Sequence, residues 1–128
     1  MWPFRPGGLL GRRGERLAAA HLRAKGFRIL ARNYRCPTGE ADIIALDPAG
    51  EAGNEALVFV EVKTRRHDDH AAPESAVDRR KRQRLLRVAR YYLACHDTAG
   101  RPVRFDVVSV VLRPAEQPDI RHIPGAFQ

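Results

Sequence analysis

The chain has 128 residues, a length typical of one domain that buries a single core without disulfides or structural metal. Its 23 lysine and arginine residues outnumber its 15 acidic residues, and the net charge of +8 favours a polyanionic partner such as nucleic acid. No apolar run has the length of a signal peptide or a membrane span, and the two cysteines form no CxxC pair. We therefore expect a cytoplasmic protein with reduced thiols and no membrane partner.

The first part of the chain is expected to form a helix followed by a strand. Residues 1–10 are predicted to be a flexible N-terminal segment, and residues 11–128 a single domain. Apolar residues at helical spacing predict a helix over 11–25, which Gly26 ends. A strand is predicted over 27–34.

The rest of the chain alternates between strand and helix patterns. The predicted elements are, in order, a strand over 42–46, a strand over 57–63, an exposed polar loop over 64–76, a helix over 77–96, a strand over 104–112 and a short edge strand over 120–123. We expect the first two of these strands to form a hairpin. The order indicates a small α/β sheet with helices packed on it.

The strand over 57–63 carries two charged residues at its end. Alternation places Glu61 and Lys63 on one face and three valines on the other. A carboxylate and an ammonium group are costly to desolvate there unless they are paired or bound to a metal. A simple Glu–Lys ion pair at the strand end is the alternative interpretation.

A second carboxylate, Asp42, opens the preceding strand. If the two strands form a hairpin, Asp42 approaches Glu61, and a divalent cation relieves the repulsion between two close carboxylates. Oxygen ligands of this kind suit Mg²⁺ or Mn²⁺, and such a metal beside Lys63 predicts phosphodiester hydrolysis. The structural alternative is that Asp42 ends the turn after Gly39 by bonding to the backbone.

A third carboxylate lies in the first predicted helix. Glu15 shares its helical stripe with Ala18 and Leu22, so we predict that it faces inward. The alternative is that it points outward or pairs with Arg12 or Arg16.

The second predicted helix is almost purely positive. Seven cations fall within twelve residues: Arg79, Arg80, Lys81, Arg82, Arg84, Arg87 and Arg90. Lys81 lies one turn before Leu85 on the predicted sheet-facing side. Solvated helix faces usually mix both signs, so this helix is predicted to contact phosphates, with plain solvation as the alternative.

Several short motifs, spread from about Gly14 to Phe127, carry a resemblance to a known family. They are Gly14-Glu15, Asn33-Tyr34-Arg35, Gly39-Glu40-Ala41-Asp42-Ile43-Ile44, Phe59-Val60-Glu61-Val62-Lys63 with Arg65, Lys81, Arg104-Phe105-Asp106-Val107-Val108 and His122-Ile123-Pro124-Gly125-Ala126-Phe127. In this order they resemble the bacterial YraN family of predicted nucleases. That family is similar to archaeal Holliday-junction resolvases within the PD-(D/E)xK nuclease superfamily.

The resemblance implies a restriction-endonuclease-like α/β core, in which a mixed central sheet of about five strands is flanked by two main helices in the order α-β-β-β-α-β. It also implies a catalytic site made of Glu15, Asp42, Glu61 and Lys63. Asp42, Glu61 and the backbone carbonyl of Val62 would hold Mg²⁺ or Mn²⁺. The residues predicted to contact nucleic acid are Arg65, Arg79, Arg80, Lys81, Arg84 and Arg87.

This chain departs from the family pattern at two positions, and neither is a proposed ligand. Ala41 stands where a larger aliphatic residue is commoner, and Gly125 where asparagine is usual.

The function expected from these features is a metal-dependent DNA endonuclease that acts on branched or structured DNA. A homodimer is expected because a resolvase cuts two strands symmetrically. The alternative is a nucleic-acid-binding accessory protein of DNA processing with a vestigial nuclease site, and RNA is a further candidate substrate.

Overall fold

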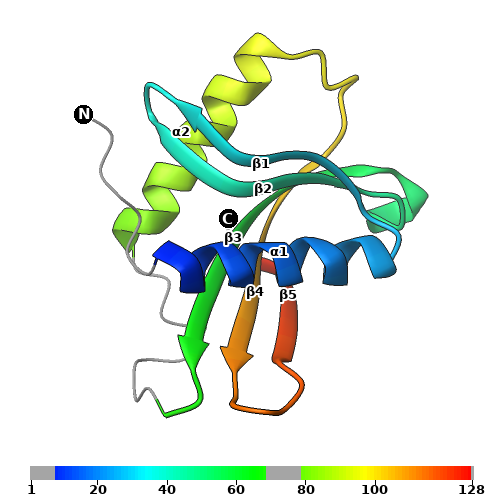
Figure 1. The fold of residues 1–128 in the computed structure, drawn as a ribbon. Helices are drawn as coiled ribbons and strands as arrows, with labels where there is room; N and C mark the ends of the chain where they lie inside the picture. The colour runs from blue at the N-terminus through cyan, green and yellow to red at the C-terminus, as the bar shows by residue number, and fades with distance from the viewer. Residues whose placement is uncertain (1–7, 69–78, 128) are drawn as a thin grey trace.

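The computed structural model of the chain describes residues 8–68 and 79–127 (Figure 1). This part of the chain contains two α-helices and five β-strands. Their bounds are α1 (Gly8–Ala24), β1 (Arg28–Cys36), β2 (Gly39–Asp47), β3 (Ala56–Arg66), α2 (Arg79–Cys95), β4 (Val103–Leu112) and β5 (Asp119–Phe127), with a short 3-10 helix η1 (Glu51–Gly53) between β2 and β3.

The strands form one mixed sheet in the order β1-β2-β3-β4-β5. β3 and β4 run parallel, and the other neighbouring strands are antiparallel. Parallel neighbours need a crossover connection, and α2 lies within that connection. The predicted α/β class, the mixed five-stranded sheet, the two flanking helices and the predicted hairpin of β2 with β3 are confirmed.

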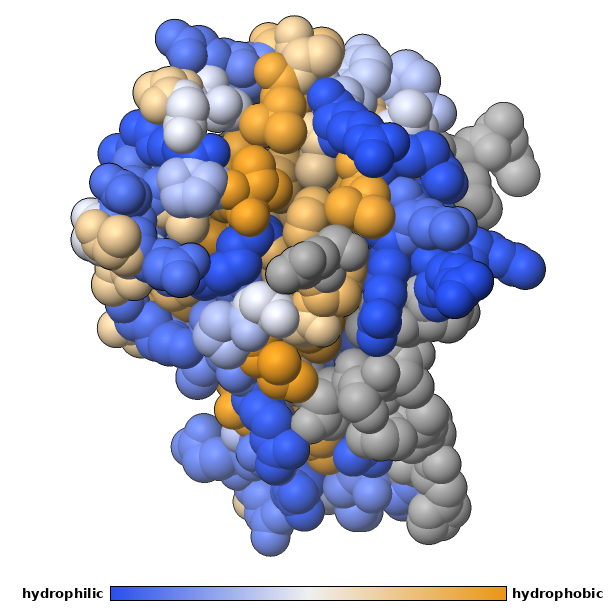
Figure 2. Space-filling model, turned by 180° about the vertical axis from the view of Figure 1, so that it is seen from behind, coloured by the Kyte–Doolittle hydropathy of each residue, from blue (hydrophilic) through white to orange (hydrophobic). Residues whose placement is uncertain are grey.

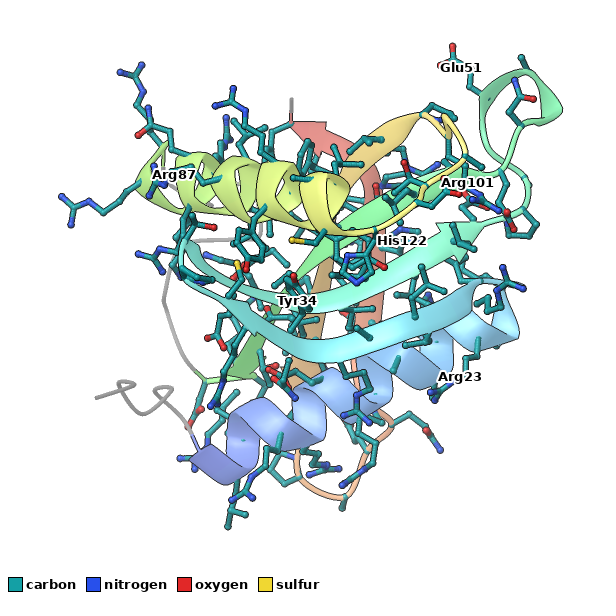
Figure 3. All side chains as sticks on the ribbon, turned by 90° about the horizontal axis from the view of Figure 1, so that it is seen from above. Arg23, Tyr34, Glu51, Arg87, Arg101 and His122 are labelled. Atoms are coloured by element: carbon teal, nitrogen blue, oxygen red, sulfur yellow. The ribbon has the colours of Figure 1, made fainter. Side chains whose placement is uncertain are left out.

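The two helices cover opposite faces of the sheet (Figures 1 and 3). The α1-side core consists of Ala18, Ala19, Leu22, Phe27, Ile43, Ala45, Ala56, Val58, Val60, Val62, Val108, Val110 and Leu112. The α2-side core consists of Ala41, Ile44, Leu46, Leu57, Phe59, Leu85, Val88, Ala89, Tyr92, Phe105, Val107 and Phe127. Each sheet face therefore buries its own set of apolar side chains, as expected for a sheet between two helix layers.

The predicted alternation of β3 is confirmed. Its three valines lie in the α1-side core, whereas Leu57 and Phe59 lie in the α2-side core. Because side chains alternate along a strand, Glu61 and Lys63 continue the second set and project toward the α2 side.

The structure differs from the prediction at the end of β3. Thr64, Arg65 and Arg66 were expected in the polar loop over 64–76, but they belong to the strand. They pair in parallel with residues 110–112 of β4, and this long-range pairing outweighs their polar character. The predicted loop residues 69–76 and the predicted helix residues 77–78 lie outside the described residues.

Three other elements extend at least three residues beyond their predicted bounds at one end. α1 begins at Gly8 and so includes residues 8–10 of the predicted N-terminal segment, of which 1–7 lie outside the described residues. β2 extends on both sides of the predicted 42–46. β5 runs well beyond the predicted 120–123 because it pairs with β4 from Val111 back to Phe105. No helix in the described ranges is both long and apolar enough to span a membrane.

Candidate active site

β2 departs from regular strand geometry at Asp42. The β2–β3 pairing ends at Ile43 opposite Val60. Ala41 packs in the α2-side core and Ile43 in the α1-side core, although residues two apart on a regular strand face the same side. The strand therefore twists and separates from β3 at Asp42, whose side chain is only 3% exposed.

The Asp42 carboxylate bridges the gap that this separation leaves. Its Oδ2 accepts a hydrogen bond from the backbone N–H of Val62 at 2.8 Å. This carboxylate oxygen replaces the backbone acceptor that β2 no longer provides. The structural alternative expected Asp42 to bond to the backbone in the turn after Gly39; the Val62 N–H is a backbone partner across the hairpin.

The same geometry places the Val62 carbonyl. Leu57 donates its N–H toward the β4 side, to the carbonyl of Pro102. Successive residues of a strand direct their backbone groups to alternate neighbours, so Val62 directs both its N–H and its C=O toward β2. The carbonyl therefore faces the gap that contains the Asp42 carboxylate.

Glu61 and Lys63 lie in the middle and second half of β3, on either side of Val62, beside this gap. Both side chains are half-buried, and Val107 and Ser109 of β4 are their partners in the parallel register. They share the α2 side of β3 with Phe59. The strand thus brings a carboxylate and an ammonium group next to the Val62 backbone, with part of each side chain accessible to solvent.

Glu15 reaches the sheet from the other face. Its side chain is 3% exposed, so the predicted inward orientation is confirmed. The preceding residue, Gly14, lies so close to β3 that an added Cβ would be 1.7 Å from Oγ1 of Thr64. α1 therefore approaches β3 more closely than any larger residue at position 14 permits.

The donor set of the predicted metal site consists of oxygen atoms. Asp42 and the Val62 backbone are joined by a hydrogen bond, and Glu61 is the neighbour of Val62 on β3. Two carboxylates and one carbonyl fit Mg²⁺ or Mn²⁺, which complete their coordination with water and substrate phosphate. Within residues 8–68 and 79–127, no three or more His, Cys, Asp or Glu side chains form a metal-binding group, so Glu15 does not complete an all-side-chain metal cluster.

The contact between Gly14 and Thr64 leads to a testable prediction. Gly14→Ala should lower the free energy of unfolding by about 1–3 kcal/mol, because the added methyl group forces α1 away from β3. Urea denaturation measures this change. In a double-mutant cycle with Thr64→Gly, which removes the atoms that the methyl group would meet, part of the loss should be recovered; strictly additive effects would contradict the contact.

The predicted basic helix is confirmed as a surface of one sign. Exposed side chains occur at all five α2 positions predicted to contact nucleic acid: Arg79, Arg80, Lys81, Arg84 and Arg87. Figure 2 shows hydrophilic side chains gathered on the side of the molecule where α2 lies, and Figure 3 shows Arg87 on this helix. Arg65, on β3, is half-buried.

Two contacts fix α2 relative to the sheet. Lys81 was predicted on the sheet-facing side, but it is exposed. The neighbouring Arg82 is half-buried instead, and its guanidinium lies 5.4 Å from the centre of the Phe127 ring. Gly39, at φ +142°, packs under the side chain of Arg84, where an added Cβ would be 2.8 Å from Cγ. β3 ends on the same side of the molecule where both helices begin (Figures 1 and 3), so the cationic start of α2 and the end of β3 share that side.

A second polar cluster is buried in the protein. We call it the Asp106 cluster, and it consists of Lys25, Arg104, Asp106 and His122. The sequence pattern had predicted no role for it. Asp106 is fully buried and accepts hydrogen bonds from Arg104 Nε and Nη2 at 2.8 and 2.9 Å, from His122 Nε2 at 2.7 Å and from the Gly125 N–H at 3.0 Å. Lys25 Nζ lies 2.6 Å from His122 Nδ1. Lys25 directly follows the last residue of α1 and comes ten residues after Glu15, which corresponds to about 15 Å along a helix, so the cluster lies beyond the C-terminal end of α1 and Glu15 near its middle.

The Asp106 cluster is electrostatically balanced. Burial alone would raise the pKa of Asp106, but hydrogen bonds from Arg104, His122 and the Gly125 N–H hold that pKa below its ordinary value. The hydrogen bond to Asp106 raises the pKa of Arg104, which also bonds to Asp47 Oδ2 at 2.9 Å. The signal in the sequence is a single aspartate within the apolar run 103–112, but nothing near it indicates which distant residues donate to it.

Comparison with known proteins gives a family but no function. Residues 14–110 match the Uncharacterised protein family UPF0102. A UPF0102 protein of Moorella thermoacetica is 49% identical over 91% of this chain and 93% of its own length. UPF0102 proteins of Nocardia farcinica and Syntrophotalea carbinolica are 46% and 44% identical, each over 92% of this chain and over 88% and 90% of their own lengths.

These matches cover nearly all of the chain, including Glu15 and both strands of the candidate active site. They confirm the family expected from the motifs, and the names of these relatives state no activity. The chain belongs to the uncharacterised protein family UPF0102.

Proposed function

We propose that this protein is a divalent-metal-dependent nuclease that hydrolyses phosphodiester bonds in DNA. The observation that carries the proposal is the Asp42–Val62 hydrogen bond at the point where β2 leaves β3. It holds a buried carboxylate beside the backbone between Glu61 and Lys63, and this fits the acidic residues and the lysine that phosphodiester hydrolysis requires.

Asp42, Glu61 and the Val62 carbonyl are the groups that would hold Mg²⁺ or Mn²⁺. Such an ion, when bound, polarises a phosphoryl oxygen and lowers the pKa of a bound water. Lys63 shares the α2 side of β3 with Glu61, and its ammonium group stabilises negative charge that develops on the phosphate. Glu15 contributes a third carboxylate from α1, held in place by the close contact of Gly14 with Thr64.

DNA is the proposed substrate because the cationic surface continues from the site onto α2. The exposed cations of that helix are suited to the sugar–phosphate backbone, and Arg65 extends them along β3. Branched or flapped DNA and action as a homodimer are further parts of the proposal, and they rest on the resemblance to resolvases.

The experiment that tests the proposal combines metal titration with cleavage. Calorimetry should detect Mg²⁺ or Mn²⁺ binding by the wild-type protein, and cleavage of labelled four-way junction, flap and duplex DNA should require the same ion. If neither metal binding nor cleavage occurs but DNA binding is salt-sensitive, the protein is instead a binding module of DNA processing. Equal activity on RNA would make RNA a substrate as well.

The contribution of α2 to DNA binding gives a further prediction. Arg84→Gln and Arg87→Gln should each weaken binding and reduce the slope of log Kd against log salt by about one, because each removes one phosphate contact. Arg23→Gln, an equal loss of charge near the end of α1, is the matched control and should leave the slope unchanged (Figure 3). The same change of slope in all three variants would show that only net charge matters.

A further inference from the structure

The exposed side of β1 carries cations that the proposed function has not used. Arg28, Arg32 and Arg35 are all exposed on this strand, which forms one edge of the sheet. Arg35 pairs with Glu40 of β2 at 3.6 Å, and its own side chain is 53% exposed. These exposed arginines on an edge strand are therefore accessible to an extended polyanion.

Asn33 has an unusual backbone at the level of the candidate active site. Its φ is +53°, a left-handed conformation that is uncommon for residues other than glycine and that asparagine tolerates better than most. Arg32 and Asn33 are exposed in succession, which interrupts the alternation of exposed and half-buried residues along β1. Irregularities of this kind redirect side chains and often occur beside active sites.

The strand register places this irregularity opposite Asp42. Arg32 pairs with Ile43 and Tyr34 with Ala41, so Asn33 is the residue of β1 that faces Asp42. Opposite residues on antiparallel strands have Cα atoms roughly 4.5–5.5 Å apart. Both strands thus depart from regular geometry at one level of the sheet, where β2 also leaves β3.

We propose that Arg32 and Asn33 bind the phosphodiester backbone of DNA beside Asp42, and that Arg35 supports this contact. The guanidinium of Arg32 provides charge, and the carboxamide of Asn33 donates hydrogen bonds to a phosphate oxygen. The position of the bound DNA beside the candidate active site rests on the proposed function. The contact of β1 with DNA does not rest on it. The alternative is that these side chains take no part in DNA binding.

The test is DNA binding in EDTA, so that no cleavage is needed. A short fluorescein-labelled duplex and a labelled four-way junction are titrated with wild-type protein and with Arg32→Gln, Asn33→Asp and Arg28→Gln. Arg28→Gln is the matched control, because it removes the same charge from the same exposed strand, five residues or roughly 16 Å from Asn33. We expect Arg32→Gln and Asn33→Asp to raise Kd by about 3- to 10-fold, and Arg28→Gln to raise it by less than about 2-fold.

A fourth variant separates the carboxamide from the backbone. Glycine adopts positive φ without strain, so Asn33→Gly keeps the left-handed backbone at this position and removes only the side chain. It should stay folded, yet bind DNA more weakly than wild type. If Asn33→Gly binds DNA as wild type does, or if Arg28→Gln and Arg32→Gln weaken binding equally, the inference is wrong.

The outcomes also separate this inference from the proposed function. Cleavage by the wild-type protein together with equal effects of Arg28→Gln and Arg32→Gln would overturn the β1 contact alone. The expected binding pattern without cleavage under any divalent ion would overturn the nuclease and leave the β1 contact supported. A wild-type protein that binds no DNA would overturn both.

Discussion

Asp42→Asn is expected to reduce Mg²⁺-dependent cleavage of DNA by at least about 100-fold while the protein keeps its fold and its affinity for DNA. The side-chain oxygen of asparagine still accepts a hydrogen bond from the Val62 N–H, so the bridge across the hairpin survives. What disappears is the negative charge that a metal ligand needs. Single-turnover cleavage measures the lost activity, the melting temperature the retained fold, a DNA titration in EDTA the retained affinity, and calorimetry the loss of metal binding.

This substitution separates the two interpretations of Asp42. If the carboxylate serves only as a hydrogen-bond acceptor, Asp42→Asn should leave cleavage intact. Glu61→Gln and Lys63→Ala are expected to remove cleavage as well, with DNA binding retained. Glu55→Gln is the control, because Glu55 precedes the same strand and bonds to Arg101 at 2.8 Å, and six residues of extended strand, roughly 20 Å, separate it from Glu61.

The Asp106 cluster should control stability. Asp106→Asn is expected to lower the free energy of unfolding by about 3–5 kcal/mol, because it removes the fully buried carboxylate that Arg104 and His122 share and leaves Arg104 with Asp47 alone. The amide NH₂ would also face groups that are all donors: Arg104, His122 and the Gly125 N–H. Urea denaturation at neutral pH measures the effect.

Asp119→Asn provides the matched control. Asp119 pairs with Arg113 at 3.7 Å, and its side chain is 56% exposed. An exposed ion pair of this kind contributes at most about 1 kcal/mol, so the control should unfold nearly as the wild type does. A similar loss of stability in both variants would show that the buried network around Asp106 has no special role.

The pH dependence of stability should report on the same carboxylate. Because the folded protein lowers the pKa of Asp106, this group stabilises the fold above its unfolded pKa of about 3.9, and the contribution is lost as pH falls through the lower, folded pKa. Stability of the wild-type protein should therefore decline below about pH 4. Asp106→Asn lacks this group, so the acid decline of its unfolding free energy should be shallower.

Local patterns in the sequence predicted the centre of the fold well. The apolar and charged residues of β3 alternate so regularly that the faces of Glu61 and Lys63 followed directly. The stripe of small residues around Glu15 likewise predicted its burial, because a helix places such neighbours on one face. The hairpin brought Asp42 next to β3, as expected from two strands adjacent in sequence.

The features that were missed depend on contacts between distant segments. Thr64 to Arg66 have the polar character of a loop, and only their parallel pairing with β4 makes them a strand. The partners of Asp106 come from β5 as well as β4, and no local pattern identifies them. Asparagine tolerates positive φ at many sites, so the sequence did not indicate that Asn33 adopts it opposite Asp42.

The two outer strands also limit how the protein associates with itself. β1 is irregular at Asn33 and lined with arginines, while Pro124 in β5 has no N–H to donate to a further strand. Such features prevent sheets from joining edge to edge into aggregates. We therefore expect any homodimer to form through helices or sheet faces, and pairing of β1 or β5 between copies in a dimer structure would contradict this.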